Sequence, residues 1–264
     1  MKPKALVLQA HGSNRDFDVI EALTLAGADA NGIPLNELRM NKTLLSDFQL
    51  LVVPGGFSYA DALGAGKLLA LDLASYFADE ISAFVESGKP VIGICNGFQA
   101  LVKSGILPFG EQKEERGKND PEATLTFNEH GHFECRWVTL KPVSKKCVWT
   151  KDLVDLIECP IAHGEGNFQT SPLFPLSSFI EHDQIALTYT HPNGTPANGD
   201  YPINPNGSIQ DIAGICNPLG NVLGLMPHPE NHIYPYQHPR HTRGETKGSG
   251  LKLFENGVKY AEQM

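Results

Sequence analysis

The stretch VIGICNGFQ, residues 91–99, passes from a short apolar run through a turn into a segment of helical character. The run Val91–Ile94 is typical of a strand buried inside a parallel sheet, and a helix is expected over Asn96–Lys103. The Gly-x-Cys-x-Gly spacing around Cys95 has the form of a nucleophile elbow, in which a strained turn projects the reactive side chain from the sheet. The stretch therefore predicts an α/β fold with Cys95 at the carboxyl end of a strand.

Cys95 would also occupy a position where a thiol becomes reactive. A helix that starts directly after it points unpaired N–H groups at the sulfur, and their partial positive charge favours a thiolate. The flanking glycines, Gly93 and Gly97, let neighbouring chain approach closely. We interpret Cys95 as the nucleophile of a hydrolase-type enzyme. The alternative is a buried cysteine that serves only as a small hydrophobic residue.

Length and composition limit the class of protein. The 264 residues suffice for one large α/β domain, or for one domain with a substantial insertion, and 41 % hydrophobic residues allow a sizeable core. The net charge of −9, with no run of Lys or Arg longer than two, argues against a nucleic-acid-binding surface. No apolar run approaches the ~18 residues of a membrane-spanning helix, so no membrane partner is expected.

The five cysteines form no Cys-x-x-Cys pair, so a structural zinc site is not expected. The apolar run at residues 5–8 is too short for the core of a signal peptide and is interpreted as a first strand. Without an export signal, reduced thiols are the default. We therefore expect a cytoplasmic protein.

Strand and helix signals alternate over the first hundred residues. Apolar runs predict strands at residues 4–10, 48–53 and 91–94, and helical spacing predicts helices at residues 17–25, 67–87 and 96–103. This alternation is typical of a parallel sheet covered by helices on both faces.

From about residue 109 the pattern changes. Residues 110–134 are polar and contain glycines, and a surface excursion is expected there. Beyond them, composition predicts strands at residues 133–140, 155–162, 185–190, 209–216 and 222–226, a loop at 192–208 and a closing helix at 249–260. The sequence shows no repeat and no clear boundary, so we expect one domain over residues 1–264.

Two glycines, Gly55 and Gly56, follow another apolar run. The carboxyl ends of parallel strands meet at one edge of a sheet, where ligands bind. A glycine pair there can turn a backbone N–H toward the nucleophile, and together with the N–H of Asn96 it would form an oxyanion hole. An ordinary turn is the alternative.

A histidine and an acid follow a further apolar run, in the segment MPHPE at residues 226–230. A cysteine nucleophile needs a base, and the base needs a carboxylate that orients it. The prolines are expected to hold the segment extended, which would place His228 and Glu230 on one side of the chain. We therefore predict that His228 and Glu230 complete a catalytic group with Cys95. A surface turn is the alternative.

A metal site is a second alternative for this region. Five possible ligands lie close together in the sequence: His228, Glu230, His232, His238 and His241. The prolines exclude a helix, and with it the arrangement in which two histidines four residues apart share one face.

The remaining glycine-rich motifs are weaker. GAGK at residues 64–67 resembles a phosphate loop only in part, because Leu68 replaces the Ser or Thr that would meet magnesium, so ATP binding is not expected. The segment IAHGEG at residues 161–166, which contains the motif HGEG, either lines a site or forms an ordinary loop. NPNGS at residues 204–208 predicts a turn.

Taken together, the glycine pair, the Gly-x-Cys-x-Gly-x-Gln run and the His-Pro-Glu segment resemble the class I (triad) glutamine amidotransferases. The motifs at residues 55–59, 95–99, 161–166, 204–208, 212–215 and 226–230 are most similar to those of the glutaminase subunits that serve purine biosynthesis. The resemblance implies a flavodoxin-like α/β fold whose central, mostly parallel sheet is flanked by helices and carries an added antiparallel portion.

The resemblance also implies an activity. Glutamine would be hydrolysed to glutamate and ammonia through a thioester on a cysteine, with no metal and no cofactor on this chain. Ammonia would pass to a synthetase subunit that uses ATP and magnesium to form a C–N bond on formylglycinamide ribonucleotide, and a small bridging subunit commonly joins the complex.

Carried over position by position, the resemblance implies roles for ten residues. The catalytic residues are Cys95, His228 and Glu230; the oxyanion donors are the N–H groups of Gly56 and Asn96; the substrate-binding residues are Gly55, Phe57, Gln99, His163 and Glu165. Three positions depart from the family pattern: Ala60 stands where glycine is expected, and Asn167 and Asn231 stand where arginine is expected.

Two other functions compete with this interpretation. A cysteine hydrolase or peptidase of flavodoxin-like architecture would use an elbow cysteine but would lack the late His-Pro-Glu. A regulatory or chaperone-like protein would use Cys95 as a redox sensor and have no hydrolytic activity.

Overall fold

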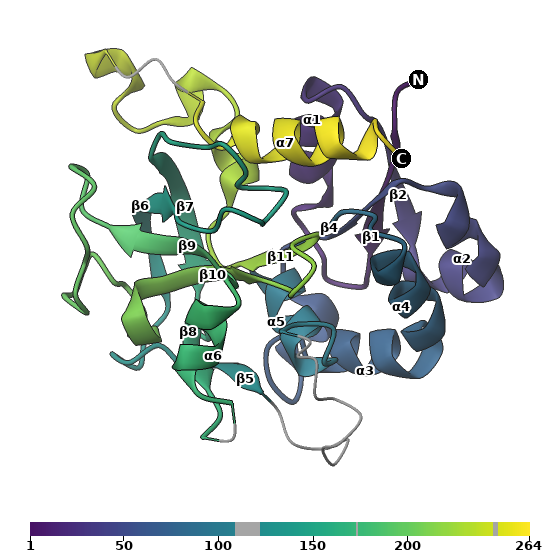
Figure 1. Ribbon diagram of the computed structural model, residues 1–264, viewed down its shortest axis with the longest axis horizontal. Helices are drawn as coiled ribbons and strands as arrows, with labels where there is room; N and C mark the ends of the chain where they lie inside the picture. Colours follow the sequence, from purple (N-terminus) through teal and green to yellow (C-terminus); the bar gives the residue numbers. More distant parts are fainter. Residues whose placement is uncertain (109–121, 173, 245–247) are drawn as a thin grey trace.

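The computed structural model describes residues 1–108, 122–172, 174–244 and 248–264 (Figure 1). Within these residues, nine strands form one sheet in the order β2-β1-β3-β4-β11-β10-β9-β6-β7, and β5 and β8 form a separate pair. Neighbours from β2 to β11 run parallel, and those from β11 to β7 run antiparallel. The expected parallel sheet with an added antiparallel portion is therefore confirmed.

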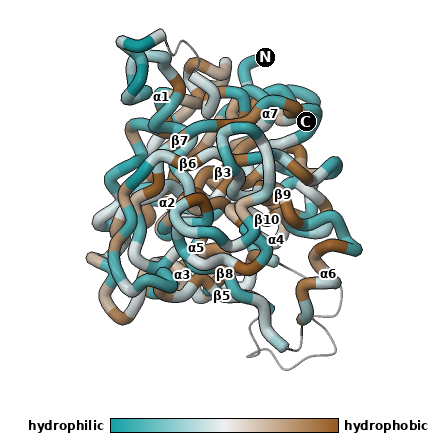
Figure 2. The backbone as a smooth tube through the Cα atoms, turned by 90° about the vertical axis from the view of Figure 1, so that its left-hand side faces the viewer, coloured by the Kyte–Doolittle hydropathy of each residue, from teal (hydrophilic) through white to brown (hydrophobic). Residues whose placement is uncertain are grey.

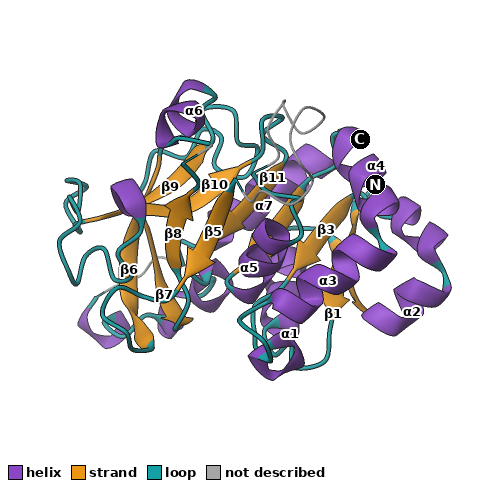
Figure 3. Cartoon of the chain, turned by 90° about the horizontal axis from the view of Figure 1, so that it is seen from below, coloured by secondary structure: helices purple, strands orange, loops and turns teal. Residues whose placement is uncertain are grey.

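The strands have the following bounds. The parallel part contains β1 (Lys4–Gln9), β2 (Asp29–Pro34), β3 (Leu50–Val53), β4 (Val91–Ile94) and β11 (Val222–Leu225), and the antiparallel part contains β10 (Ile212–Cys216), β9 (Ile185–Thr190), β6 (Glu134–Pro142) and β7 (Ile157–His163). The separate pair consists of β5 (Ala123–Thr126) and β8 (Asn167–Thr170), and Figure 3 shows it beside α5.

Helices cover both faces of the parallel part. Figure 1 shows α1 (Asp16–Leu25) and α7 (Leu251–Ala261) on one side, with α3 (Lys67–Tyr76), α4 (Ala78–Glu86) and α5 (Asn96–Lys103) toward the other. Two short helices, α2 (Leu35–Met40) and α6 (Leu176–Glu181), lie at the periphery. The central strands β3, β4 and β11 are buried along their whole length, which is why their sequences are apolar without alternation. In Figure 2, β3 lies between α1 and α7 above it and α3 and α5 below it.

The approach of α5 to the sheet depends on Gly97. A Cβ at this position would lie 1.9 Å from the carbonyl oxygen of Val53, at the end of β3. No side chain fits between the helix and that strand, so glycine is required for their contact. This contact brings the start of α5 to the carboxyl ends of β3 and β4, the edge of the sheet where the motifs gather.

Three expectations from the sequence are wrong in detail. The helix expected at residues 67–87 is two helices, because Phe77 leaves the helical conformation (φ −130, ψ 12) while its ring is buried. The strand expected at 209–216 begins only at Ile212, after a 3₁₀ turn in which Gln210 has φ 50. The excursion expected at 110–134 lies outside the described residues over 109–121, but Ala123–Thr126 is a strand paired with β8.

No helix in the described part of the chain is both long enough and apolar enough to cross a membrane.

Candidate active site

Cys95 stands on the predicted turn between β4 and α5. Its backbone has φ 49 and ψ −106, a conformation that residues with a side chain rarely adopt. The Cys95 N–H donates to Leu225 O at 2.8 Å, so the neighbouring strand β11 holds the turn in place. The predicted strand, sharp turn and helix are confirmed, and such local strain is concentrated at functional sites.

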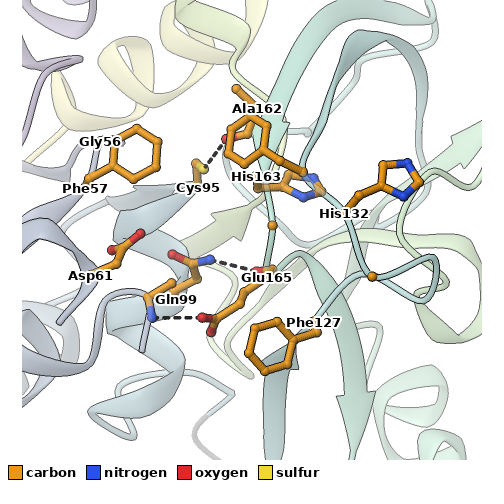
Figure 4. Close-up of a pocket in the computed structure, with 14 residues that line it drawn as sticks. Gly56, Phe57, Asp61, Cys95, Gln99, Phe127, His132, Ala162, His163 and Glu165 are labelled. Atoms are coloured by element: carbon orange, nitrogen blue, oxygen red, sulfur yellow. Dashed lines mark hydrogen bonds between the residues drawn. The ribbon is translucent and has the colours of Figure 1, made fainter. Parts of the chain in front are cut away.

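The Cys95 side chain faces a cavity of about 290 Å³ (Figure 4). The cavity is lined by residues from four parts of the chain: Gly56, Phe57, Asp61, Ala65, Cys95, Gln99, Phe127, Gly131, His132, Phe133, Ala162, His163, Gly164 and Glu165. Only 4 % of Cys95 is exposed, and its Sγ lies 3.7 Å from Ala162 O. The sulfur is thus reached from this cavity and is otherwise enclosed.

His228 and Glu230 form a buried pair. Nδ1 of His228 lies 2.7 Å from Oε1 of Glu230. The backbone N–H of His228 donates to Pro160 O at 2.8 Å. The segment is not extended as expected: Pro229–His232 is a 3₁₀ turn, since proline at the first position of a turn gives up no hydrogen bond there. The two side chains nevertheless meet, because the turn brings the carboxylate back onto the imidazole.

The electrostatics of His228 connect it to Cys95. Burial lowers the pKa of the imidazole, but the Glu230 carboxylate and the charge and hydrogen bond of the Cys95 sulfur outweigh burial and raise the pKa to about 10. The arrangement therefore favours an imidazolium beside the Cys95 sulfur.

Gly55 and Gly56 occupy the position that the sequence predicts, directly after β3. Gly56 has φ 137, and a Cβ there would lie 2.7 Å from the backbone nitrogen of Asn14, so this position requires glycine. Among the described groups, the backbone N–H groups of Gly56 and Asn96 have no hydrogen-bond partner. Gly56 lines the cavity, and Asn96 directly follows Cys95. Two free donors at these positions can meet a negative charge that develops beside the sulfur.

Gln99 and Glu165 connect α5 to the turn between β7 and β8. The Gln99 amide donates to Glu165 O at 2.7 Å (Figure 4). Its oxygen accepts from the Asn96 amide at 3.1 Å. The Glu165 carboxylate lies 3.3 Å from Lys103 Nζ and accepts from Ala65 N–H at 3.2 Å. Both side chains line the cavity, and both brace its floor.

His163 is held beneath the HGEG turn. Its Nδ1 lies 3.1 Å from Asn128 Oδ1, and the same oxygen accepts the Gly166 N–H at 3.0 Å. Burial, followed by the nearby positive charge of His228, lowers the pKa of His163 to about 3, so the ring is neutral. Its packing against Gly166, where a Cβ would lie 2.3 Å from Cε1, indicates that His163 shapes this wall of the cavity.

The histidines considered for a metal site are engaged in other contacts, although the rings of His232 and His238 lie 5.1 Å apart. His232 Nδ1 meets the Glu158 carbonyl, His238 Nε2 lies 2.8 Å from the Glu158 carboxylate, and His241 is exposed in a 3₁₀ turn. In the part of the chain that the structure describes, no three His, Cys, Asp or Glu side chains are grouped to hold a metal ion.

The weaker motifs have structural places. The GAGK segment leads into α3, and Gly66 (φ 69) packs on α5, where a Cβ would lie 2.9 Å from Ala100 N. The NPNGS segment supports the HGEG turn, because the Asn206 amide donates to Gly166 O at 2.9 Å and the Ser208 hydroxyl donates to the same oxygen at 3.3 Å.

The three departures from the family pattern are accommodated locally. Ala60 has φ 54, the left-handed conformation in which glycine is more stable. The Asn231 amide donates to Asp18 at 3.1 Å, and the adjacent Glu230 keeps its contact with His228. Asn167 accepts from the Gln169 amide at 2.7 Å.

The sequence did not predict several residues that line or support the cavity. Asp61 places a carboxylate in the cavity, Phe127 and Phe133 line it, and Asn128 holds the HGEG turn. Ala162, which presents its carbonyl to the sulfur, lies in the segment 161–166 that was expected to line a site or form a loop. The polar, glycine-containing run after Gly56 is the one signal that could have drawn attention to Asp61.

Comparisons with known proteins agree with this geometry. A model of the CobB/CobQ-like glutamine amidotransferase domain matches residues 2–261. Phosphoribosylformylglycinamidine synthase subunit PurQ of Treponema denticola is 54 % identical, with 98 % of this chain and 99 % of that protein covered. The same subunit of Dehalococcoides mccartyi is 43 % identical, with 100 % and 99 % covered.

Solved structures show the same fold. PurLQS from Thermotoga maritima contains a chain with a TM-score of 0.73 and 31 % identity, covering 98 % of this chain and 99 % of that one. A glutamine amidotransferase from the same organism has a TM-score of 0.57 at 15 % identity, which supports the fold alone, with 100 % of both chains covered. The chain therefore belongs to the glutamine amidotransferases and, within them, to the family of phosphoribosylformylglycinamidine synthase subunits named PurQ.

Proposed function

We propose that this chain hydrolyses glutamine to glutamate and ammonia as the glutaminase subunit of phosphoribosylformylglycinamidine synthase, with Cys95 as nucleophile. The observation that carries the proposal is the strained Cys95 turn (φ 49, ψ −106) beside a buried His228 that Glu230 holds at 2.7 Å. These contacts support the roles of Cys95 as nucleophile, His228 as base and Glu230 as the acid that orients the base in acyl transfer.

In the first step, the Cys95 thiolate attacks the carboxamide carbon of glutamine. The carbonyl oxygen gains negative charge and is stabilised by the backbone N–H groups of Gly56 and Asn96. The His228 imidazolium gives its proton to the amide nitrogen, the C–N bond breaks, and ammonia leaves. The product on the enzyme is a γ-glutamyl thioester.

In the second step, His228 is neutral and takes a proton from water. The resulting hydroxide attacks the thioester carbon, the C–S bond breaks, and glutamate leaves with Cys95 again a thiolate beside the imidazolium. Glu230 keeps Nδ1 of His228 protonated throughout, so Nε2 is the atom that exchanges the proton.

The other residues position these groups. Gly55 leaves room for the imidazole, because a Cβ there would lie 2.7 Å from Cε1 of His228. Gln99 and Glu165 tie α5 to the opposite wall of the cavity, with a hydrogen bond of 2.7 Å from the Gln99 amide to Glu165 O. Phe57 and His163 complete the walls of the cavity. The proposed substrate-binding residues are therefore Phe57, Gln99, His163 and Glu165, which line the cavity, together with Gly55 beside His228.

The mouth of the cavity supports docking of a second subunit. Phe57, Phe127 and Phe133 line the cavity, yet they are 45 %, 71 % and 50 % exposed. A partner that covers these three rings would bury apolar surface and separate departing ammonia from water. We propose that this partner is the synthetase subunit, which amidates formylglycinamide ribonucleotide with ATP and magnesium, and that a small bridging subunit joins, as the name PurLQS of the Thermotoga maritima structure suggests.

We further propose that residues 1–264 act as one domain and that the protein works in the cytoplasm. The matched family model extends over residues 2–261, and purine biosynthesis is expected in that compartment.

The function is tested by incubating the chain, reconstituted with its synthetase and small subunits, with glutamine or with casein. Release of glutamate, and a γ-glutamyl adduct on Cys95 after rapid acid quench, support the proposal. Casein cleavage without glutamate release would support the peptidase alternative instead. Selective alkylation of Cys95 by 6-diazo-5-oxonorleucine would exclude a purely regulatory thiol.

A further inference from the structure

Two carboxylates line the cavity beside Cys95, and they differ in how their charge is balanced. Glu165 is neutralised by Lys103, whose Nζ lies 3.3 Å away. Among the described side chains, no Lys, Arg or His forms an ion pair with Asp61. Asp61 instead accepts a hydrogen bond from the Asn96 amide at 3.0 Å. The cavity therefore contains one carboxylate, that of Asp61, which has no ion-pair partner among the described side chains.

The chain holds Asp61 in the cavity at a conformational cost. Tyr59, Ala60 and Asp61 have φ of 54, 54 and 51, three consecutive non-glycine residues in the left-handed region. Such outliers persist where the surrounding structure enforces them, and they cluster at ligand sites. Here the Ser58 N–H donates to the Asn96 side chain at 3.1 Å and fixes the segment beside the nucleophile.

The direction of the side chain follows from this backbone. Figure 4 shows the Asp61 carboxylate on the same side of the cavity as Phe57, turned toward the space that Cys95 faces. Burial and, more weakly, the charge of Glu165 raise the pKa of the Asp61 carboxyl. The hydrogen bonds from the Gly66 backbone and the Asn96 amide and the more distant charge of Lys103 oppose this rise without cancelling it. A cation beside the carboxylate would remove this penalty.

We propose that Asp61 binds the α-ammonium group of the glutamine substrate and thereby selects α-amino acid amides over amides that lack this group. The inference rests on the proposed function, because it assumes that the carboxamide reacts at Cys95. The cavity of about 290 Å³ contains both residues, so one small molecule can present its carboxamide to the sulfur and its ammonium to the carboxylate. Glu165 is less suited to bind the ammonium group, since its carboxylate already forms an ion pair with Lys103.

A purely structural role for Asp61 makes a different prediction. If its carboxylate served only to orient Asn96, its loss would slow the reaction of every amide equally. The Asp61→Asn variant separates the two roles, because asparagine keeps an oxygen that accepts from the Asn96 amide but removes the charge. Asp72→Asn is the matched control, since Asp72 accepts from the Tyr59 hydroxyl behind the same segment and does not line the cavity.

The experiment measures glutaminase kcat/KM of the reconstituted complex for glutamine and for 4-carbamoylbutanoate, which is glutamine without its α-amino group. Asp61→Asn should lower kcat/KM for glutamine on the order of ten- to a hundredfold, because a hydrogen bond to a charged group usually contributes that much. It should leave kcat/KM for 4-carbamoylbutanoate unchanged. Asp72→Asn should leave the ratio of the two values unchanged. An equal fall for both substrates, or no fall for either, in Asp61→Asn would overturn the assignment.

A second measurement uses the rate at which Cys95 is alkylated in the same complex. Asp61→Asn should slow alkylation by 6-diazo-5-oxonorleucine, which carries an α-ammonium group, but not alkylation by iodoacetamide, which lacks one. Equal slowing by both reagents would contradict the assignment. If the wild-type complex releases no glutamate although iodoacetamide modifies Cys95, the proposed function itself fails and the Asp61 assignment fails with it. Glutamate release with an unchanged substrate ratio would refute the Asp61 assignment alone.

Discussion

Gly55 and His228 are in direct contact: a Cβ at position 55 would lie 2.7 Å from Cε1 of the imidazole. The ring cannot move aside without losing its 2.7 Å contact with Glu230, which is completely buried. Glycine is therefore required at position 55 for more than the turn after β3. A side chain there would occupy the space that the imidazole of His228, the proposed base, fills.

Gly55→Ala should consequently impair catalysis more than stability. The added methyl group displaces the imidazole, and a misplacement of about 1 Å costs on the order of a hundredfold in rate. We expect kcat for glutamine hydrolysis to fall by about that factor, with a thermal unfolding curve that remains cooperative. Wild-type kcat in a folded Gly55→Ala protein would show that His228 does not need this position.

The protonation of His228 gives a second prediction. Because Glu230 and the Cys95 sulfur raise its pKa to about 10, the imidazole should be protonated at pH 8, which ¹⁵N chemical shifts report directly. Both neighbours stabilise the charged form, so Glu230→Gln and Cys95→Ala should each move the titration midpoint to lower pH. A midpoint that stays in place in both variants would contradict the coupling between these residues.

Ala60 gives a prediction about stability. Its φ of 54 is unfavourable for alanine, and the left-handed conformation costs about 1–2 kcal/mol in a residue with a side chain. Ala60→Gly should raise the free energy of unfolding by about 1 kcal/mol, measured by urea denaturation, after allowance for the greater freedom of glycine in the unfolded chain. Ala62→Gly is the control: Ala62 has φ −55, so glycine there should stabilise nothing. A gain in both variants would refute the role of the backbone conformation.

Asn128 gives a prediction about the HGEG turn. Its amide oxygen accepts from the Gly166 N–H and meets His163 Nδ1, and its Nδ2 donates to the His163 carbonyl at 2.8 Å. Asn128→Ala leaves these buried groups unpaired and should lower the free energy of unfolding by about 2–3 kcal/mol.

The matched control is Asn193→Ala, which removes only exposed hydrogen bonds to Thr195 and should cost less than about 1 kcal/mol. Equal losses in the two asparagine variants would mean that Asn128 contributes no more than an exposed turn residue.

The exposed rings of Phe57, Phe127 and Phe133 at the opening of the cavity predict where the synthetase subunit docks. Phe127→Ser should weaken binding to the synthetase subunit, measured by calorimetry, and lower glutamine-dependent synthesis, while thermal stability of the isolated chain is kept because the ring is 71 % exposed. Phe17→Ser, at a side chain that is 76 % exposed on α1 and outside the cavity, should leave the affinity unchanged. Unchanged affinity in Phe127→Ser would place the partner elsewhere.

Local patterns predicted most of the parallel part of the sheet, and long-range contacts explain what they missed. Strands β3, β4 and β11 are buried on both faces, so their sequences are unbroken apolar runs that are easy to recognise. The edge strand β2 has the sequence DANGIP with no fully buried residue, which left no such run. Phe77 continues the helical spacing of residues 67–87, so the sequence pattern does not show that the helix ends there. The backbone of Phe77 shows that end in the folded chain, where its ring is buried.

The site shows the same division. The elbow at Cys95 was predictable because strand, glycine spacing and helix are all local. The contact between His228 and Glu230 was predicted from an extended backbone, whereas a 3₁₀ turn produces it. Asp61 and Asn128 were not predicted, because each is placed by a contact with a segment distant in sequence: Asp61 with Asn96, and Asn128 with the HGEG turn.

The central claim is that Cys95 makes ammonia for chemistry carried out on another chain. It is tested most directly by Cys95→Ala in the reconstituted synthase, with formylglycinamide ribonucleotide and ATP present and either glutamine or ammonium chloride as nitrogen source. We predict that synthesis from glutamine is abolished and that synthesis from ammonia continues at the wild-type rate. Loss of both activities in a correctly assembled complex, or retention of glutamine-dependent synthesis, would contradict the account.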